Sequence, residues 1–148
     1  MRYLLDAGIL LRLAVAGDPA HKIVRDAVDK LLAGGDELCF TFQLMREFWS
    51  VATRPQSVNG YGLNTAQATT APALFPLHFS YLADSESVRD EWLVLVTKHN
   101  VVGKNAHDAG HVAAMKAHGI SLILSLDQRD FSRYSEVQVI RPEAILAR

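Results

Sequence analysis

The segment Lys104–Phe131 constrains the fold more than any other part of the chain. Small and apolar residues recur through its first half at helical spacing, Asn105 suits the N-cap, and Gly119 stands where such a helix would end. Ile120–Leu126 is then a short apolar run typical of a buried strand. An acidic loop follows directly, and in open α/β sheets ligands bind beyond the carboxyl ends of the strands. The segment therefore predicts an α/β fold with a functional site at this loop, beyond the carboxyl end of the strand.

The remainder of the chain alternates between strand-like and helix-like stretches in the same way. The predicted strands are Tyr3–Leu5, Glu37–Thr41, Leu77–Leu82, Ile120–Leu126 and Val137–Ile140. The predicted helices are a short one after Gly8, His21–Leu32, Phe42–Thr53, Thr65–Leu74 interrupted at Pro72, one capped by Ser85 that runs to about His99, and the one before Gly119, with a terminal turn at Pro142–Leu146. Strands that alternate with helices favour a parallel sheet covered on both faces. We therefore expect residues 1–148 to form a single α/β domain.

Composition excludes some classes of protein and leaves others open. With 148 residues, of which 49% are hydrophobic, the chain is long enough for one sizeable core. The net charge of −1 gives no basic surface that indicates nucleic acid, although a bound metal would supply positive charge locally. Cys39 is the single cysteine, which excludes an internal disulfide and suits a reducing compartment, so we expect a cytoplasmic protein. No run is long enough to cross a membrane.

Four acidic residues stand where a parallel sheet would bring them to one edge: Asp6, Glu47, Asp108 and Asp127. Carboxylates packed together repel one another, and a divalent cation relieves that repulsion. Oxygen ligands of this kind select Mg²⁺ or Mn²⁺, which can polarise a phosphoryl group and activate water. Each acid alone also has a structural explanation, because Asp108 would complement a helix dipole, Glu47 would lie on the surface and Asp127 would belong to a turn.

Three stretches of the sequence together resemble the PIN-domain family, and more closely the toxin ribonucleases of the VapC type. They are LLDAGILLRL, REFWSVATRP and NAHDAGHVAAMKAHGISLILSLDQRDF, and the resemblance extends over nearly the whole chain in the family's order. The resemblance implies a three-layer α/β/α sandwich and a metal-dependent endoribonuclease. It places the family's acids on Asp6, Glu47, Asp108 and Asp127, with Asp130 as a nearby alternative or supporting residue. It also implies Mg²⁺, with Mn²⁺ as a substitute, an RNA substrate, a small antitoxin partner in a type II pair, and a homodimer.

One departure from the family pattern bears on activity. The family usually places Thr or Ser, and then Asn or Ser, after the first aspartate, whereas this chain has Ala7 and Gly8. Two side-chain hydrogen-bonding groups are therefore missing, and losses of this kind can cost about 10–100-fold in metal affinity or activity. The alternative hypothesis is a catalytically weak or degenerate PIN fold that acts as a binding module.

His107, His111 and His118 fall within one stripe of the predicted helix. His107 and His111 have the spacing of a zinc-protease motif, but the third ligand of the extended motif would fall on Ala117. His107 followed by Asp108 also resembles the HD phosphohydrolases, which are all-helical and so do not fit the predicted strands. We interpret the stripe as polar surface at the far edge of the sheet or as part of a subunit contact, away from the direction of Asp108.

The aromatic and basic residues give weaker signals. Phe48, Trp49 and Trp92 lie at core spacing on predicted helices, so we interpret them as core residues and not as surfaces for stacking bases. Arginines and lysines such as Arg46 and Lys104 are scattered along the chain, and we interpret each as an ordinary solvated charge, although those that flank the acids could contact phosphates.

Overall fold

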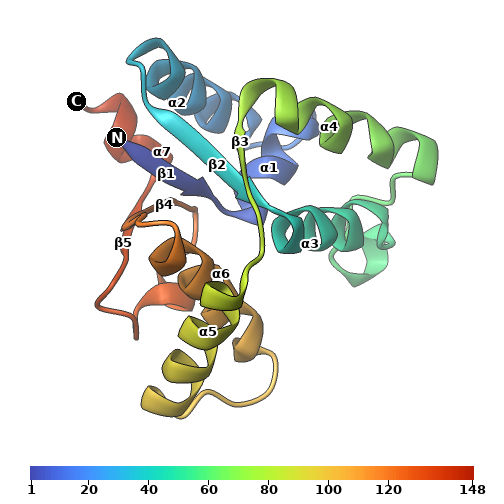
Figure 1. Cartoon of the computed structure of the whole chain (residues 1–148). Helices are drawn as coiled ribbons and strands as arrows, with labels where there is room; N and C mark the ends of the chain where they lie inside the picture. Colours follow the sequence, from blue (N-terminus) through green and yellow to red (C-terminus); the bar gives the residue numbers. More distant parts are fainter.

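The computed structural model describes all 148 residues and contains one parallel sheet with helices on both sides (Figure 1). The strands are β1 (Arg2–Leu5), β2 (Glu37–Thr41), β3 (Ser80–Leu82), β4 (Leu122–Leu124) and β5 (Gln138–Ile140). The helices are α1 (Ala7–Ala14), α2 (His21–Ala33), α3 (Phe42–Thr53), α4 (Thr65–His78), α5 (Glu86–Lys98), α6 (Asn105–Ala117) and α7 (Pro142–Leu146), with short 3-10 helices η1 (Gln56–Val58) and η2 (Arg129–Phe131). The predicted α/β class is confirmed.

The order of the strands creates a crevice at one edge of the sheet. The five strands lie in the order β3-β2-β1-β4-β5, and every neighbouring pair is parallel. The chain builds outward from β1 through β2 to β3, and then returns to the other side of β1 to add β4 and β5. Such a reversal between neighbouring strands is where parallel sheets bind ligands. The carboxyl ends of β1 and β4 are therefore the expected place for a functional site.

The helices form two layers around a central strand, β1, whose last three residues are apolar and buried. In Figure 1, α1, α2 and α4 lie above the sheet, α5 and α6 lie together below it, and α7 packs beside α2. Tyr3, Leu4 and Leu5 of β1 have no exposed surface, as a central parallel strand requires. Phe48 belongs to the same core, whereas Trp49 is 37% exposed, so the prediction that Trp49 is a core residue was wrong. No helix combines the length and the hydropathy needed to span a membrane.

The region before β3 differs from the prediction because the helix continues through both of its prolines. Instead of stopping near Leu74, α4 runs to His78, and only Ser80–Leu82 forms a strand. Each proline leaves a helical hydrogen bond unmade. Phe75 lies between the prolines, and its ring packs edge-on against Phe48 at 5.4 Å and Phe40 at 5.8 Å. This aromatic packing holds the second half of the helix against the sheet.

The segment Lys104–Phe131 forms the predicted helix, followed by a strand that is shorter than predicted. The helix begins at Asn105, but Lys104 occupies the N-cap position and no side chain caps the helix there. Gly119 has φ +68°, a left-handed conformation that suits glycine, and it ends the helix as predicted. The predicted strand Ile120–Leu126 is reduced to Leu122–Leu124.

Candidate active site

A cavity of about 690 Å³ opens where β1 and β4 end, and four carboxylates line it. Asp6 follows β1, Glu47 comes from α3, Asp108 from the first turn of α6, and Asp130 from η2. Residues from four separate parts of the chain thus meet at the crevice that the strand order creates. The predicted convergence of Asp6, Glu47 and Asp108 is observed.

Asp6 is held on two sides. It is the N-cap of α1, where one carboxylate oxygen accepts a hydrogen bond from the backbone N–H of Ala7 at 2.8 Å. Its Oδ2 accepts a hydrogen bond from the Ser125 hydroxyl at 2.6 Å, and Ser125 is itself fully buried just after β4. Burial raises the pKa of Asp6, although the bond from Ser125 and the charge of His111 oppose that rise. The Asp6 carboxylate is therefore fixed in position, with a charge that the folded protein accommodates at a cost.

Glu47 is held by α6 as well as by its own helix. Nε2 of His111 lies 2.9 and 3.0 Å from its two carboxylate oxygens, and the Gln43 side-chain amide donates to one of them at 3.1 Å. Burial alone would raise the pKa of Glu47, but the hydrogen bond and charge of His111 outweigh burial and lower it. Glu47 is therefore the carboxylate of the cavity whose ionisation the fold favours, and its orientation is set by contacts from two helices.

Asp108 and Asp130, like Asp6, are acids whose ionisation the fold opposes. Burial raises the pKa of Asp108 to about 6, and the charge of Asp130 contributes next. Burial also raises the pKa of Asp130, with the charges of Asp127 and Asp6 adding to the rise. Like charges that disfavour each other's ionisation in a shared cleft are typical of functional sites.

Asp127 does not line the cavity, although the sequence pointed to it as the fourth acid. Its carboxylate accepts a hydrogen bond from the backbone N–H of Arg129 at 2.8 Å, and its own N–H donates to Ser125 Oγ at 3.1 Å. These bonds fix the turn that leads into η2. Asp130, which the sequence offered only as the alternative, faces the other three acids instead.

His111 is the site residue that the sequence analysis misassigned. The histidines were interpreted as surface polar groups directed away from Asp108, but His111 is only 2% exposed and contacts Glu47. Burial alone would lower the pKa of His111, yet the hydrogen bond and charge of Glu47 raise it, helped by Asp6 and Asp108. His107 also lines the acidic cavity, whereas the ring of the half-buried His118 lies 2.9 Å from the carbonyl oxygen of Ala83. A signal was present, because His111 follows Asp108 by three residues and so shares its face of the helix.

The Ala7 and Gly8 positions lie in the first turn of α1 beside Asp6. A Cβ at Gly8 would lie 3.3 Å from Nη1 of Arg12, and that guanidinium donates to the Gly8 carbonyl oxygen at 3.1 Å. Arg12 therefore folds back over the place where the family usually has a polar side chain. Because Ala7 and Gly8 have no polar side chain, Ser125 is the only side chain that donates a hydrogen bond to Asp6.

The donor set of the cavity suits a hard divalent cation, because carboxylate oxygens are the ligands that Mg²⁺ and Mn²⁺ prefer. Burial is the main cause of the raised pKa values of Asp6, Asp108 and Asp130, and a cation would relieve the repulsion between carboxylates that adds to it. No three histidine, cysteine, aspartate or glutamate side chains converge closely enough in this structure to form a metal site. The chemistry of the residues fits a metal, and metal binding stays a prediction.

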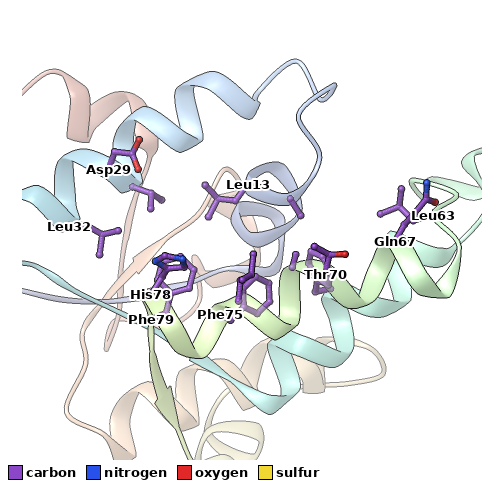
Figure 2. A pocket seen from close by; sticks show the side chains of 14 residues that line it. Leu13, Asp29, Leu32, Leu63, Gln67, Thr70, Phe75, His78 and Phe79 are labelled. Atoms are coloured by element: carbon purple, nitrogen blue, oxygen red, sulfur yellow. The ribbon is translucent and has the colours of Figure 1, made fainter.

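A second surface feature is an apolar groove of about 410 Å³ between α1, α2 and α4 (Figure 2). Figure 2 shows Leu13 of α1 and Leu32 of α2 on one side of it, with Phe75 and His78 of α4 on the other. Its lining is mainly apolar, and Leu32 is 37% exposed. Exposed apolar grooves of this kind are typical of surfaces that bind another protein.

The fold agrees with the comparison to known protein families. The model of the PIN domain matches residues 3–137, and the chain therefore belongs to the PIN domain family. No curated protein sequence matches the chain.

Solved structures with the same fold include proteins of toxin–antitoxin systems. VapBC2 from Rickettsia felis, bound to a promoter DNA fragment, has a TM-score of 0.69 at 13% identity over 95% of this chain and 98% of that chain. VapC20 from Mycobacterium tuberculosis, a sarcin–ricin loop cleaving toxin, has a TM-score of 0.67 at 17% identity over 89% and 95%. FitAcB from Neisseria gonorrhoeae has a TM-score of 0.64 at 18% identity over 97% and 99%. These similarities confirm the three-layer PIN fold.

Proposed function

We propose that this chain is a metal-dependent endoribonuclease and the toxin of a type II toxin–antitoxin pair. The observation that carries the proposal is the cavity at the carboxyl edge of the sheet, where carboxylates from four separate elements face one another. A PIN domain supports nuclease activity, and among the solved structures of this fold is a toxin that cleaves the sarcin–ricin loop. The proposed substrate is RNA, cut by hydrolysis of a phosphodiester bond.

Asp6 and Asp108 are the proposed principal metal ligands, and Glu47 and Asp130 complete the set or position water. Bound Mg²⁺, or Mn²⁺ in its place, would polarise the phosphoryl group and lower the pKa of water. The protein contributes orientation, because Ser125 fixes Asp6 and His111 fixes Glu47. Asp127 supports the set indirectly through the turn that presents Asp130.

The proposed partner is a small antitoxin, and the apolar groove of Figure 2 is the surface that best fits one of its helices. Solved structures of the same fold include VapBC and other toxin–antitoxin complexes. An amphipathic helix whose apolar face fills such a groove is a common mode of recognition. A homodimer is part of the same proposal.

A second candidate function is a degenerate PIN fold that binds RNA or protein without cleaving it. Two observations favour it: Ala7 and Gly8 supply no side-chain hydrogen bond to the site, and the carboxylates do not form a closed metal site. Both candidates predict binding, so catalysis separates them.

The test is cleavage of an end-labelled single-stranded RNA by the purified chain, with Mg²⁺ or with a chelator. The proposal expects cleavage that requires the metal. Asp6→Asn, purified in parallel, controls for contaminating ribonucleases and is expected to be inactive. Activity that persists in the chelator or in the Asp6→Asn form would contradict the proposal, and binding without cleavage would establish the second candidate.

A further inference from the structure

A second cavity of about 400 Å³ adjoins the acidic one. It lies between α3, α5 and α6, and it shares Gln43, Arg46 and His107 with the acidic cavity. The two cavities are therefore neighbouring parts of one surface. The composition of the second differs, because Arg46 and Arg89 line it against a single acid, Asp84.

Arg46 is the cation best placed to act in both cavities. Its guanidinium carbon lies 4.9 Å from the centre of the Phe42 ring, a cation–π contact that limits its motion without neutralising its charge. It takes part in none of the ion pairs of the structure. Arg89 does pair with Asp90 at 3.0 Å, but both side chains are more than 60% exposed, so that pair is weak. A free guanidinium thus stands on the wall between the cavities.

The walls of the second cavity are fixed by hydrogen bonds. The Trp92 indole N–H donates to the carbonyl oxygen of Ala106 at 2.9 Å, which holds the ring at the side of the cavity. The Gln43 side-chain amide donates to the carbonyl oxygen of His107 at 2.8 Å, which ties α3 to α6. A Cβ at Gly110 would lie 2.5 Å from Gln43 Oε1, so this close approach depends on glycine. The cavity is therefore formed before any ligand arrives.

We propose that the second cavity binds the nucleotide next to the scissile phosphodiester. Arg46 then contacts the RNA phosphate that lies between the acidic cavity and the second cavity. The inference rests on the proposed ribonuclease function. It adds the path of the bound RNA, which runs from the acidic cavity into the second cavity. The acidic cavity repels RNA phosphates, and Arg46 is the one arginine or lysine that lines this cavity and can offset that repulsion there. Arg89 contributes a second positive charge, and the Trp92 ring gives an apolar side against which a base can pack.

The test measures binding of a fluorescent single-stranded RNA to the full chain by anisotropy, in a chelator that prevents cleavage. Arg46→Gln is expected to weaken binding about tenfold and to reduce the slope of log affinity against log salt by about 0.7, the value for one phosphate contact on a single strand. Arg89→Gln is expected to have a smaller effect of the same kind. Arg25→Gln, which removes a charge from α2 outside both cavities, is the matched control and is expected to leave the slope unchanged.

Steady-state cleavage with Mg²⁺ then separates this inference from the proposed function. The Arg46→Gln form is expected to raise KM about tenfold while kcat stays within twofold. If the wild type cleaves RNA but Arg46→Gln and Arg25→Gln bind equally well, the subsite is wrong and the proposed function stands. If the wild type neither binds nor cleaves RNA, the subsite and the proposed ribonuclease function are both wrong. If Arg46→Gln weakens binding of an oligoglutamate peptide but not of RNA, the cavity takes an acidic protein segment instead.

Discussion

Replacing Asp108 with asparagine is expected to abolish cleavage while making the metal-free protein more stable. Asp108 is half-buried at the start of α6, where burial and the charge of Asp130 raise its pKa to about 6. Asparagine has nearly the same shape without the charge, so it removes the repulsion and one proposed metal ligand together. Activity is expected to fall by about 100-fold or more, since even a lost supporting contact at a metal site costs 10–100-fold.

The gain in stability follows from the difference between the two pKa values. The rise from 3.8 to about 6 corresponds to about 3 kcal/mol at 1.36 kcal/mol per pKa unit. Because Asp108 is partly exposed, solvent screening reduces this to about 1 kcal/mol. The folded state holds the proton more tightly than the unfolded state, so ionised Asp108 destabilises the fold above about pH 6. The advantage of asparagine is therefore full at neutral pH, declines as pH falls through 6, and disappears near pH 4.

The assay is urea unfolding followed by tryptophan fluorescence, in a chelator, at pH 7 and at pH 4.5. Asp29→Asn, a change at an exposed aspartate on α2, controls for the general loss of a negative charge. The reasoning would be refuted if Asp108→Asn were less stable than the wild type at pH 7, or if it cleaved RNA at the wild-type rate.

Three further predictions concern the surroundings of the metal ligands. Asp130→Asn is expected to lower the rate of RNA cleavage at least tenfold, whereas Asp127→Asn should cost only a few fold, and equal effects would show that the cavity assignment is wrong. His111→Gln places an amide where the imidazole Nε2 lies and should keep activity and Mn²⁺ affinity within a few fold, whereas the shorter His111→Asn should lose about tenfold in both. The double change Ala7→Thr with Gly8→Asn is expected to lower the half-maximal Mg²⁺ concentration for cleavage by up to about tenfold, and an unchanged value in a folded variant would remove the motive for a degenerate site.

Sequence patterns predicted the class of fold and three of the four acids in the cavity because both depend on strand order and strand ends. Asp6 and Asp108 follow from the alternation of buried strands and helices, since parallel strands end at the same edge. The choice between Asp127 and Asp130 was not predictable from spacing. It depends on a turn in which the Asp127 carboxylate bonds the backbone of Arg129, which takes one acid out of the cavity and presents the other.

The remaining differences come from tertiary contacts that local patterns do not contain. The helix α4 continues past Pro72 because Phe75 packs against residues far away in sequence, Phe40 and Phe48. His111 was misassigned because a buried histidine resembles a surface one until its partner is known. That partner, Glu47, lies 64 residues earlier in the chain.

Calorimetric titration of the purified chain with Mn²⁺ tests the central claim, that the acids at the carboxyl edge of the sheet form a metal site. The wild type is expected to bind Mn²⁺, with affinity that rises between pH 5 and 7 as Asp108 ionises. Asp6→Asn is expected to lose that binding, and Asp29→Asn, on the exposed surface of α2, is expected to retain it. Mn²⁺ binding that is unchanged in the Asp6→Asn form, or no binding by the wild type, would contradict the account.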